Sequence, residues 1–158
     1  LVLLSASGAP IKEESSPPMA LRMMKNPFGR FLIKRIWSRS MAKKSLEDMV
    51  FDKSSITEEE IDRMWDFSTY PGNMDAMFRE FGETWDFFDP ADIEEITSNT
   101  LLIWGKEDSI CPPSMGNWYD SNLPNSTMVV LPNIGHNPHF ECPDRCSDEI
   151  SSWLGALT

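Results

Sequence analysis

The sequence has few cysteines and no long apolar run, and each shortage excludes a class of protein. Its 158 residues contain three cysteines, Cys111, Cys142 and Cys146, which cannot close into a complete set of disulfides and show no CxxC spacing. This excludes a disulfide-stabilised scaffold and is typical of a reducing compartment, so we expect a cytoplasmic protein. No apolar run approaches the roughly 20 residues of a membrane-spanning helix, so we expect no membrane span.

Basic residues are also scarce. The chain has 14 Lys and Arg against 25 Asp and Glu, which gives it a net charge of −11. A chain this acidic repels a phosphate backbone, which argues against nucleic acid as a partner. The charge is uneven: residues 12–44 are basic and residues 47–95 are acidic. We interpret these blocks as solvent-exposed faces. With 41% hydrophobic and 25% charged residues, the composition is that of a globular chain with one compact core.

The first two thirds of the chain predict a short strand and then a helical region. Residues 1–4 form an apolar run typical of a strand buried on both faces, and residues 8–18 are rich in Pro, Ser and charge, as in a loop. Between residues 12 and 89 no segment convincingly predicts a strand. We therefore expect a helical lobe rich in methionine and aromatic side chains there.

Three patterns indicate the helices of that lobe. Apolar residues recur at helical spacing from Phe28 to Met41, between basic residues. We expect this helix to pack on its neighbours with a wet basic face, although a membrane-surface helix has the same pattern. Thr57 and Glu60 form a capping box, and a further helix begins near Asn73.

The last third alternates between strand and helix patterns. Residues 100–104 and 127–131 are apolar strand segments, and residues 113–123 and 143–154 have helical spacing with proline near the first turn. Strand, helix, strand, helix at this spacing predicts a parallel α/β sheet.

Reactive side chains follow both of these predicted strands. The first strand is followed by Gly-Lys-Glu-Asp, ending at Asp108, and the second by a turn that contains His136. Because the carboxyl ends of parallel strands lie at one edge of a sheet, we expect these two side chains to meet. A carboxylate bonded to one ring nitrogen fixes the histidine tautomer and stabilises the imidazolium. Glu107 is the rival acid, and His139 is expected to hold the turn or border the pocket.

A zinc site formed by His136, His139, Cys142 and Cys146 is a weaker interpretation, because these residues lack the paired spacing of a structural site. No glycine-rich phosphate loop is present. We therefore expect neither a metal nor an organic cofactor.

The two motifs GKED and GHNPHFECP, about 30 residues apart, resemble the last third of the α/β-hydrolase fold family. The second motif matches the family pattern at Gly135, His136, Pro138, His139, Glu141 and Pro143. The resemblance implies that Asp108 is the triad acid and His136 the catalytic base. It also implies a core strand and the start of a loop at 1–11, an inserted helical cap at 12–90, and the C-terminal part of the core at 91–158. The expected fold is thus α/β, with part of the parallel sheet of an α/β-hydrolase and an inserted helical cap.

The family's nucleophile, on a Gly-x-Ser-x-Gly turn between a strand and a helix, is not recognisable here. Ser7 fits this turn loosely, but the proline-rich residues after it cannot form the buried helix that the turn requires. The chain has no initiator Met and opens on an apparent buried strand. We therefore expect a fragment whose nucleophile lies upstream, and which is inactive by itself.

By resemblance, the parent protein hydrolyses a small or medium, largely apolar substrate at an ester or at a carbon–carbon bond next to a ketone. An Asp nucleophile would instead indicate an epoxide hydrolase or a haloalkane dehalogenase, and a ligand-binding member without catalysis is the remaining alternative. The expected partner is a small-molecule substrate, and the oligomeric state stays open. Candidates for the pocket wall are Trp65, Met74, Phe78 and Trp85.

Overall fold

A computed structural model describes residues 1–10, 26–82 and 87–157 of the chain. The chain forms two compact units. The sheet unit comprises Leu1–Ser16, Met49–Asp52 and Asp86–Thr158, and the helical unit comprises Pro17–Asp48 and Lys53–Trp85. The short segment Met49–Asp52 thus belongs to the sheet unit, although the chain on either side of it belongs to the helical unit.

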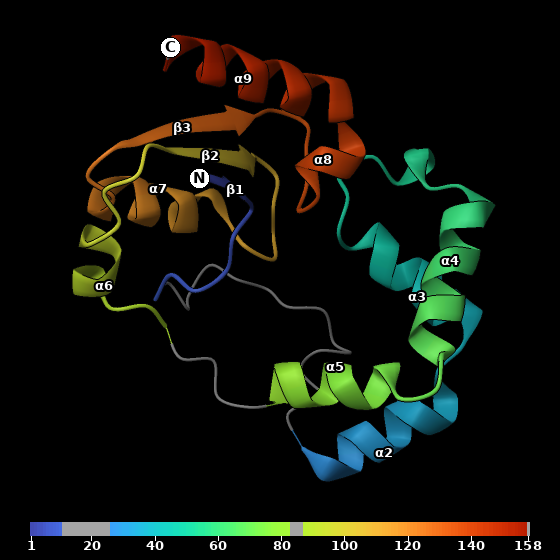
Figure 1. Ribbon diagram of the computed structural model, residues 1–158. Helices are drawn as coiled ribbons and strands as arrows, with labels where there is room; N and C mark the ends of the chain where they lie inside the picture. The colour runs from blue at the N-terminus through green and yellow to red at the C-terminus, as the bar shows by residue number, and fades with distance from the viewer. Residues whose placement is uncertain (11–25, 83–86, 158) are drawn as a thin grey trace. The chain divides into compact units, whose positions relative to one another are not determined.

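Three parallel strands form the sheet in the order β1 (Val2–Leu4), β2 (Thr100–Gly105) and β3 (Ser126–Leu131). Every residue of the central strand β2 is buried, as the apolar run at residues 101–104 predicts for a strand covered on both faces. Figure 1 shows the three arrows side by side, pointing the same way. The predicted strands and their parallel arrangement are confirmed. The expectation that the first strand is buried on both faces is wrong, because β1 lies at one edge of the described sheet and is only partly buried. The helices of this unit are α6 (Pro90–Glu94), α7 (Pro113–Asn122), α8 (Pro138–Glu141) and α9 (Pro143–Ala156).

Helices cover both faces of the sheet, with α7 on one side and α9 on the other (Figure 1). Successive side chains of β2 point to opposite faces. Leu102 and Trp104 join the apolar cluster beneath α7, whereas Leu101 and Ile103 join the cluster beneath α9. This layered arrangement confirms the predicted α/β class. The short helices α6 and α8 were not predicted, because the apolar periodicity of the sequence does not indicate them.

The helical unit contains α2 (Pro27–Ile36), α3 (Arg39–Glu47), the 3-10 turn η1 (Lys53–Ser55), α4 (Glu58–Thr69) and α5 (Asn73–Gly82). The capping box predicted for α4 is confirmed. The Glu60 amide donates to Thr57 Oγ1 at 3.3 Å, and the Thr57 amide donates to Glu60 Oε2 at 2.7 Å. None of the described helices combines the length and the apolar character needed to cross a membrane.

The single helix expected from Phe28 to Met41 is wrong, because the chain forms two helices with a break at Trp37 and Ser38. Trp37 leaves the helical conformation at ψ 129°, Ser38 has extended backbone, and the Trp37 indole donates to Ser68 Oγ of α4 at 2.8 Å. The apolar stripe is also not packed as expected. Phe28 and Phe31 are 74% and 65% exposed, and Ile33 turns inward instead.

Candidate active site

Asp108 lies in the turn that follows β2, and backbone amides hold its carboxylate in place. Its Oδ1 accepts from the amides of Ile110 and Cys111, both at 2.9 Å. The residue is 3% exposed, and its side chain is fully buried. These two bonds fix the orientation of the carboxylate and leave Oδ2 for a further partner.

His136 is that partner, on the turn after β3. Its Nδ1 lies 2.9 Å from Asp108 Oδ2, and 23% of the His136 side chain is exposed to solvent. Its backbone amide donates to the Met49 carbonyl at 2.7 Å. No bond to Nε2 occurs among the residues that the structure describes. The contact expected from the order of the strand ends is therefore present.

Two glycines allow the turns to approach closely enough for this contact. A Cβ on Gly105 would overlap the carbonyl oxygens of Ile134 and Gly135, and a Cβ on Gly135 would lie 2.8 Å from the Met49 carbonyl oxygen. The backbone atoms in these contacts cannot move aside as a flexible side chain could. The glycine of each motif is thus required by the close packing of backbone against backbone.

Glu107, the rival acid, joins the two turns through its bonds to Ile134, and none of the bonds between described residues joins it to the imidazole. Its Oε2 accepts from the Ile134 amide at 3.1 Å, and its own amide donates to the Ile134 carbonyl at 3.0 Å. His139 is exposed on α8 and has no hydrogen bond to the residues described here. The structure therefore leaves Asp108 as the acid that contacts a histidine.

Sequence reasoning missed two contributors to this site. Glu141 accepts hydrogen bonds from amides on both sides of His136, and the segment Met49–Asp52 contacts the same turn. Glu141 occurs in the sequence motif, but its partners cannot be derived from the pattern. Met49–Asp52 carries no recognisable motif at all.

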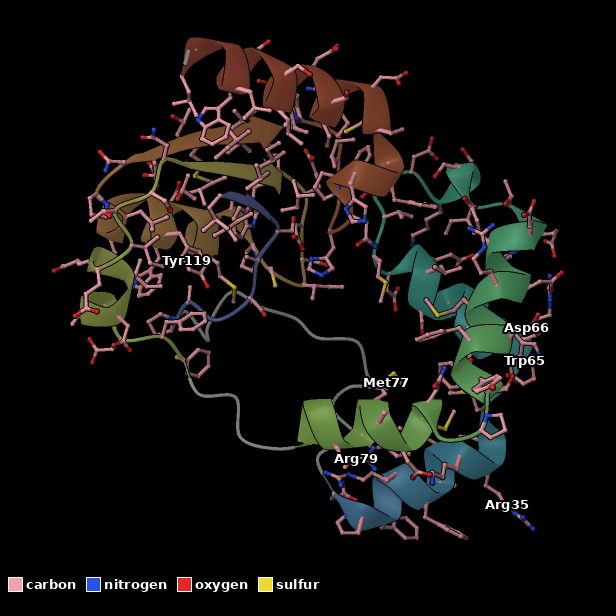
Figure 2. All side chains as sticks on the ribbon, viewed as in Figure 1. Arg35, Trp65, Asp66, Met77, Arg79 and Tyr119 are labelled. Carbon is pink, nitrogen blue, oxygen red and sulfur yellow. The ribbon has the colours of Figure 1, made fainter. Side chains whose placement is uncertain are left out.

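The predicted pocket-wall residues lie in the helical unit or outside the described part of the chain. Phe78 is 3% exposed and packs with Met74 against Ile33, in the interior of the helical unit. Trp65 is half-buried on α4 (Figure 2). Trp85 lies outside the described residues. The pocket-wall role of these four residues stays a prediction.

Ser7 makes no hydrogen bond to His136. Its carbonyl accepts from the Tyr119 hydroxyl of α7 at 2.5 Å, and the residue is exposed. Figure 2 labels Tyr119 beside this part of the chain. Its neighbour Ser5 has a positive φ of 45°, but no helix follows among residues 6–10. Neither serine occupies a strand–turn–helix elbow in the described part of the chain.

The described residues contain no group of three or more His, Cys, Asp or Glu that could hold a metal ion. Cys111, Cys142 and Cys146 are all free thiols. Burial, with a smaller contribution from the Asp108 carboxylate, raises the pKa of the Cys111 thiol from 9.0 to about 12. The thiol beside Asp108 is therefore neutral at physiological pH, and its charge does not compete with that of the carboxylate.

This raised pKa predicts a loss of stability in alkali. Between about pH 9 and pH 12 the unfolded thiol is ionised whereas the native Cys111 thiol keeps its proton. The unfolded state therefore binds fewer protons, and the free energy of unfolding should fall by on the order of 1 kcal/mol per pH unit in this range. Urea unfolding across this range should give a shallower decline for Cys111→Ala than for the unchanged chain. Equal declines would contradict the prediction.

Comparison with known proteins places this geometry in a family. The sequence model of the α/β hydrolase fold matches residues 8–143. The chain is 31% identical over 154 residues to the uncharacterized hydrolase YugF of Bacillus subtilis (strain 168), which covers 98% of this chain and 55% of that protein. It is 28% identical over 110 residues to 2-hydroxy-6-oxononadienedioate/2-hydroxy-6-oxononatrienedioate hydrolase 2 of Pseudomonas putida, covering 63% and 36% of the two chains.

Solved structures agree on the fold. The meta-cleavage product hydrolase of Pseudomonas fluorescens IP01 superposes with a TM-score of 0.76 at 19% identity, over 99% of this chain and 56% of that one. The chain spans about half the length of the first curated relative and of this structure. The family model covers both motifs of the site and the residues between β1 and β2 from residue 8 onward. The chain belongs to the α/β hydrolase fold family.

Proposed function

We propose that this chain is the C-terminal half of a hydrolase in which His136 is the general base and Asp108 orients it. The observation that carries the proposal is the 2.9 Å contact between His136 Nδ1 and the buried Asp108 Oδ2 at neighbouring strand ends. The acid, Asp108, precedes the histidine, His136, in the chain, which is the order of these two residues in the family's triad.

The geometry suits proton transfer through the other ring nitrogen. Because Asp108 Oδ2 accepts from Nδ1–H, the imidazole is held in the tautomer whose Nε2 carries a lone pair. Nε2 can then take the proton of a nucleophile and later return it to the leaving group. The buried carboxylate stabilises the imidazolium formed in between, and its two backbone hydrogen bonds keep it from turning away.

The nucleophile, in this proposal, precedes Leu1. The half-length match to relatives supports this placement, as does the lack of a serine elbow in the described residues. A serine there would attack the carbonyl of an ester, or of a ketone next to the carbon–carbon bond to be cleaved. The name of the Pseudomonas putida relative, a hydrolase of an unsaturated oxo-dicarboxylate, favours including the second substrate class.

The helical unit is proposed to be the cap that covers the substrate. Its methionine and aromatic content favours a largely apolar, small or medium substrate. Of the predicted wall residues, Trp65 and Met74 remain partly exposed and are the better candidates, because Phe78 is already used in the interior of the unit. The three free thiols support a cytoplasmic location.

Burst kinetics with a short p-nitrophenyl ester test the proposal on the whole hydrolase that contains this chain. We expect a rapid release of p-nitrophenol as the acyl-enzyme forms, and loss of that burst in His136→Ala. His139→Ala is the matched control and should keep the burst. The 158-residue chain alone should release none above background, because the proposed nucleophile lies upstream of it.

Three outcomes would overturn parts of this proposal. A burst from the isolated chain would place the nucleophile within it. Halide release or epoxide opening without ester cleavage would indicate an Asp nucleophile upstream. Tight binding of an apolar ligand without turnover, unaffected by His136→Ala, would indicate a binding protein and would contradict the catalytic assignment.

A further inference from the structure

The carboxylate of Glu141 accepts amide hydrogen bonds from both sides of His136. The Gly135 amide lies 2.9 Å from Oε1 and 3.1 Å from Oε2, and the Asn137 amide lies 3.4 Å from Oε1. These two amides flank the histidine in the chain. A carboxylate that accepts from backbone amides makes charge-assisted bonds, which are stronger than bonds between neutral groups.

The same carboxylate binds a third segment, 90 residues away in the sequence. The Phe51 amide donates to Glu141 Oε2 at 2.7 Å. The segment Met49–Asp52, which we name the strap, also accepts the His136 amide at the Met49 carbonyl, at 2.7 Å. The Glu141 carboxylate of helix α8 thus binds both the strap and the histidine turn, and the His136–Met49 backbone bond joins those two segments directly.

Close packing leaves these bonds little freedom to rearrange. A Cβ on Gly135 would lie 2.8 Å from the Met49 oxygen and 2.9 Å from the Phe51 nitrogen, so the strap and the turn are in direct contact. Helix α8 has four residues and cannot hold a fixed conformation alone. The strap and Glu141 therefore supply the fixed points of the histidine turn.

We propose that Glu141 is a positioning residue for His136, which acts by fastening the histidine turn to the strap so that Nδ1 stays on Asp108. The catalytic consequence rests on the function proposed above, whereas the positioning itself does not. The strap is continuous with α3 and η1, whose residues belong to the helical unit. The strap and the histidine turn both belong to the sheet unit, so the bonds between them lie within one unit.

A local role, in which Glu141 does no more than stabilise α8, is the alternative to exclude. A structural role of that kind would lower stability without changing the bond between His136 and Asp108. A positioning role requires that the His136 imidazole itself responds. The measurement must therefore report on the ring nitrogen and not on the fold.

Nitrogen-15 and proton NMR of the histidine side chains gives that report. The 158-residue chain has two histidines, so His139 is an internal reference in every spectrum. The Nδ1 proton of His136, bonded to Asp108, should give a far-downfield resonance that exchanges slowly with water. Glu141→Gln preserves the shape of the side chain but replaces one accepting oxygen by a donor that opposes the amides.

We expect Glu141→Gln to make the His136 Nδ1 proton exchange about tenfold faster and to shift the ring toward a mixture of tautomers. The unfolding midpoint should also fall, because Glu141→Gln weakens the charge-assisted bonds from the Gly135, Asn137 and Phe51 amides, so the His136 signals and not the midpoint separate the two roles. Glu95→Gln, the same substitution at an exposed residue with no side-chain bond to the described residues, should leave His136 unchanged. His139 should not respond to either variant.

A double variant separates action through Asp108 from a general effect. In an Asp108→Asn background the bond is already lost, so adding Glu141→Gln should change the His136 tautomer ratio no further. Unchanged His136 signals in Glu141→Gln would overturn the proposal, and so would an equal effect in the presence and absence of Asp108. Because this readout needs no substrate, failure of the positioning role is distinguishable from failure of the hydrolase assignment. In the whole hydrolase, Glu141→Gln should lower kcat and leave KM unchanged.

Discussion

Replacing Gly105 with alanine is expected to separate the two turns of the site and to destabilise the sheet unit by about 3 kcal/mol. The added methyl group would overlap the carbonyl oxygens of Ile134 and Gly135, which are backbone atoms. The Lys106 amide bond to Leu131 and the Glu107 amide bond to Ile134 lie beside the overlap and would lengthen with it. Urea unfolding measures the loss, and the downfield Nδ1 proton of His136 reports the separation.

Gly155→Ala is the matched control for this substitution. Gly155 lies in the last turns of α9, and a Cβ there meets nothing within 4 Å. Because alanine favours helix over glycine, this variant should be unchanged or more stable by up to about 1 kcal/mol. Equal stability of Gly105→Ala and Gly155→Ala would show that the glycine of the first motif is not required by packing.

Asp108→Asn is expected to lower kcat of the whole hydrolase by about ten-thousand-fold while the fold is retained. Asparagine has the same shape, and its oxygen can still accept from the Ile110 and Cys111 amides. Its NH2 group would then face His136 Nδ1, which favours the wrong tautomer and removes the charge that stabilises the imidazolium. Steady-state kinetics at neutral pH, with circular dichroism to verify the fold, measure the effect.

Glu107→Gln provides the comparison, since Glu107 is the neighbouring acid and the rival in the sequence. Its carboxylate accepts from the Ile134 amide at 3.1 Å, a bond that the glutamine oxygen can also make. We expect this variant to keep most of its activity. If Glu107→Gln lowered kcat as much as Asp108→Asn, the assignment of Asp108 as the acid of the site would be wrong.

Local patterns predicted the strands of the sheet unit and the start of a helix in the helical unit. The apolar strand at 100–104 lies within β2, and the capping box at Thr57 begins α4. Both depend on residues close together in the sequence, which is why periodicity and capping rules suffice for them. The contact between Asp108 and His136 was also predictable, because the topology of a parallel sheet brings successive strand ends to one edge.

Where the prediction failed, distant contacts overrode the local pattern. The helix expected across Trp37 and Ser38 breaks where Trp37 bonds to Ser68 of another helix. Phe28 and Phe31 are exposed because Ile33, on the opposite side of α2, packs on Phe78. Apolar spacing marks a helix but does not determine which of its sides faces the interior.

The amino-acid order alone determined the alternation of strands and helices and the acid and base that follow two neighbouring strands. Tertiary structure decided which atoms fasten them: the Glu141 carboxylate, the strap at Met49–Asp52, and the glycines that allow backbone to touch backbone. The physical reason is separation along the chain. A bond between residues 90 positions apart leaves no periodic signal, because its partners are chosen by how the folded segments meet.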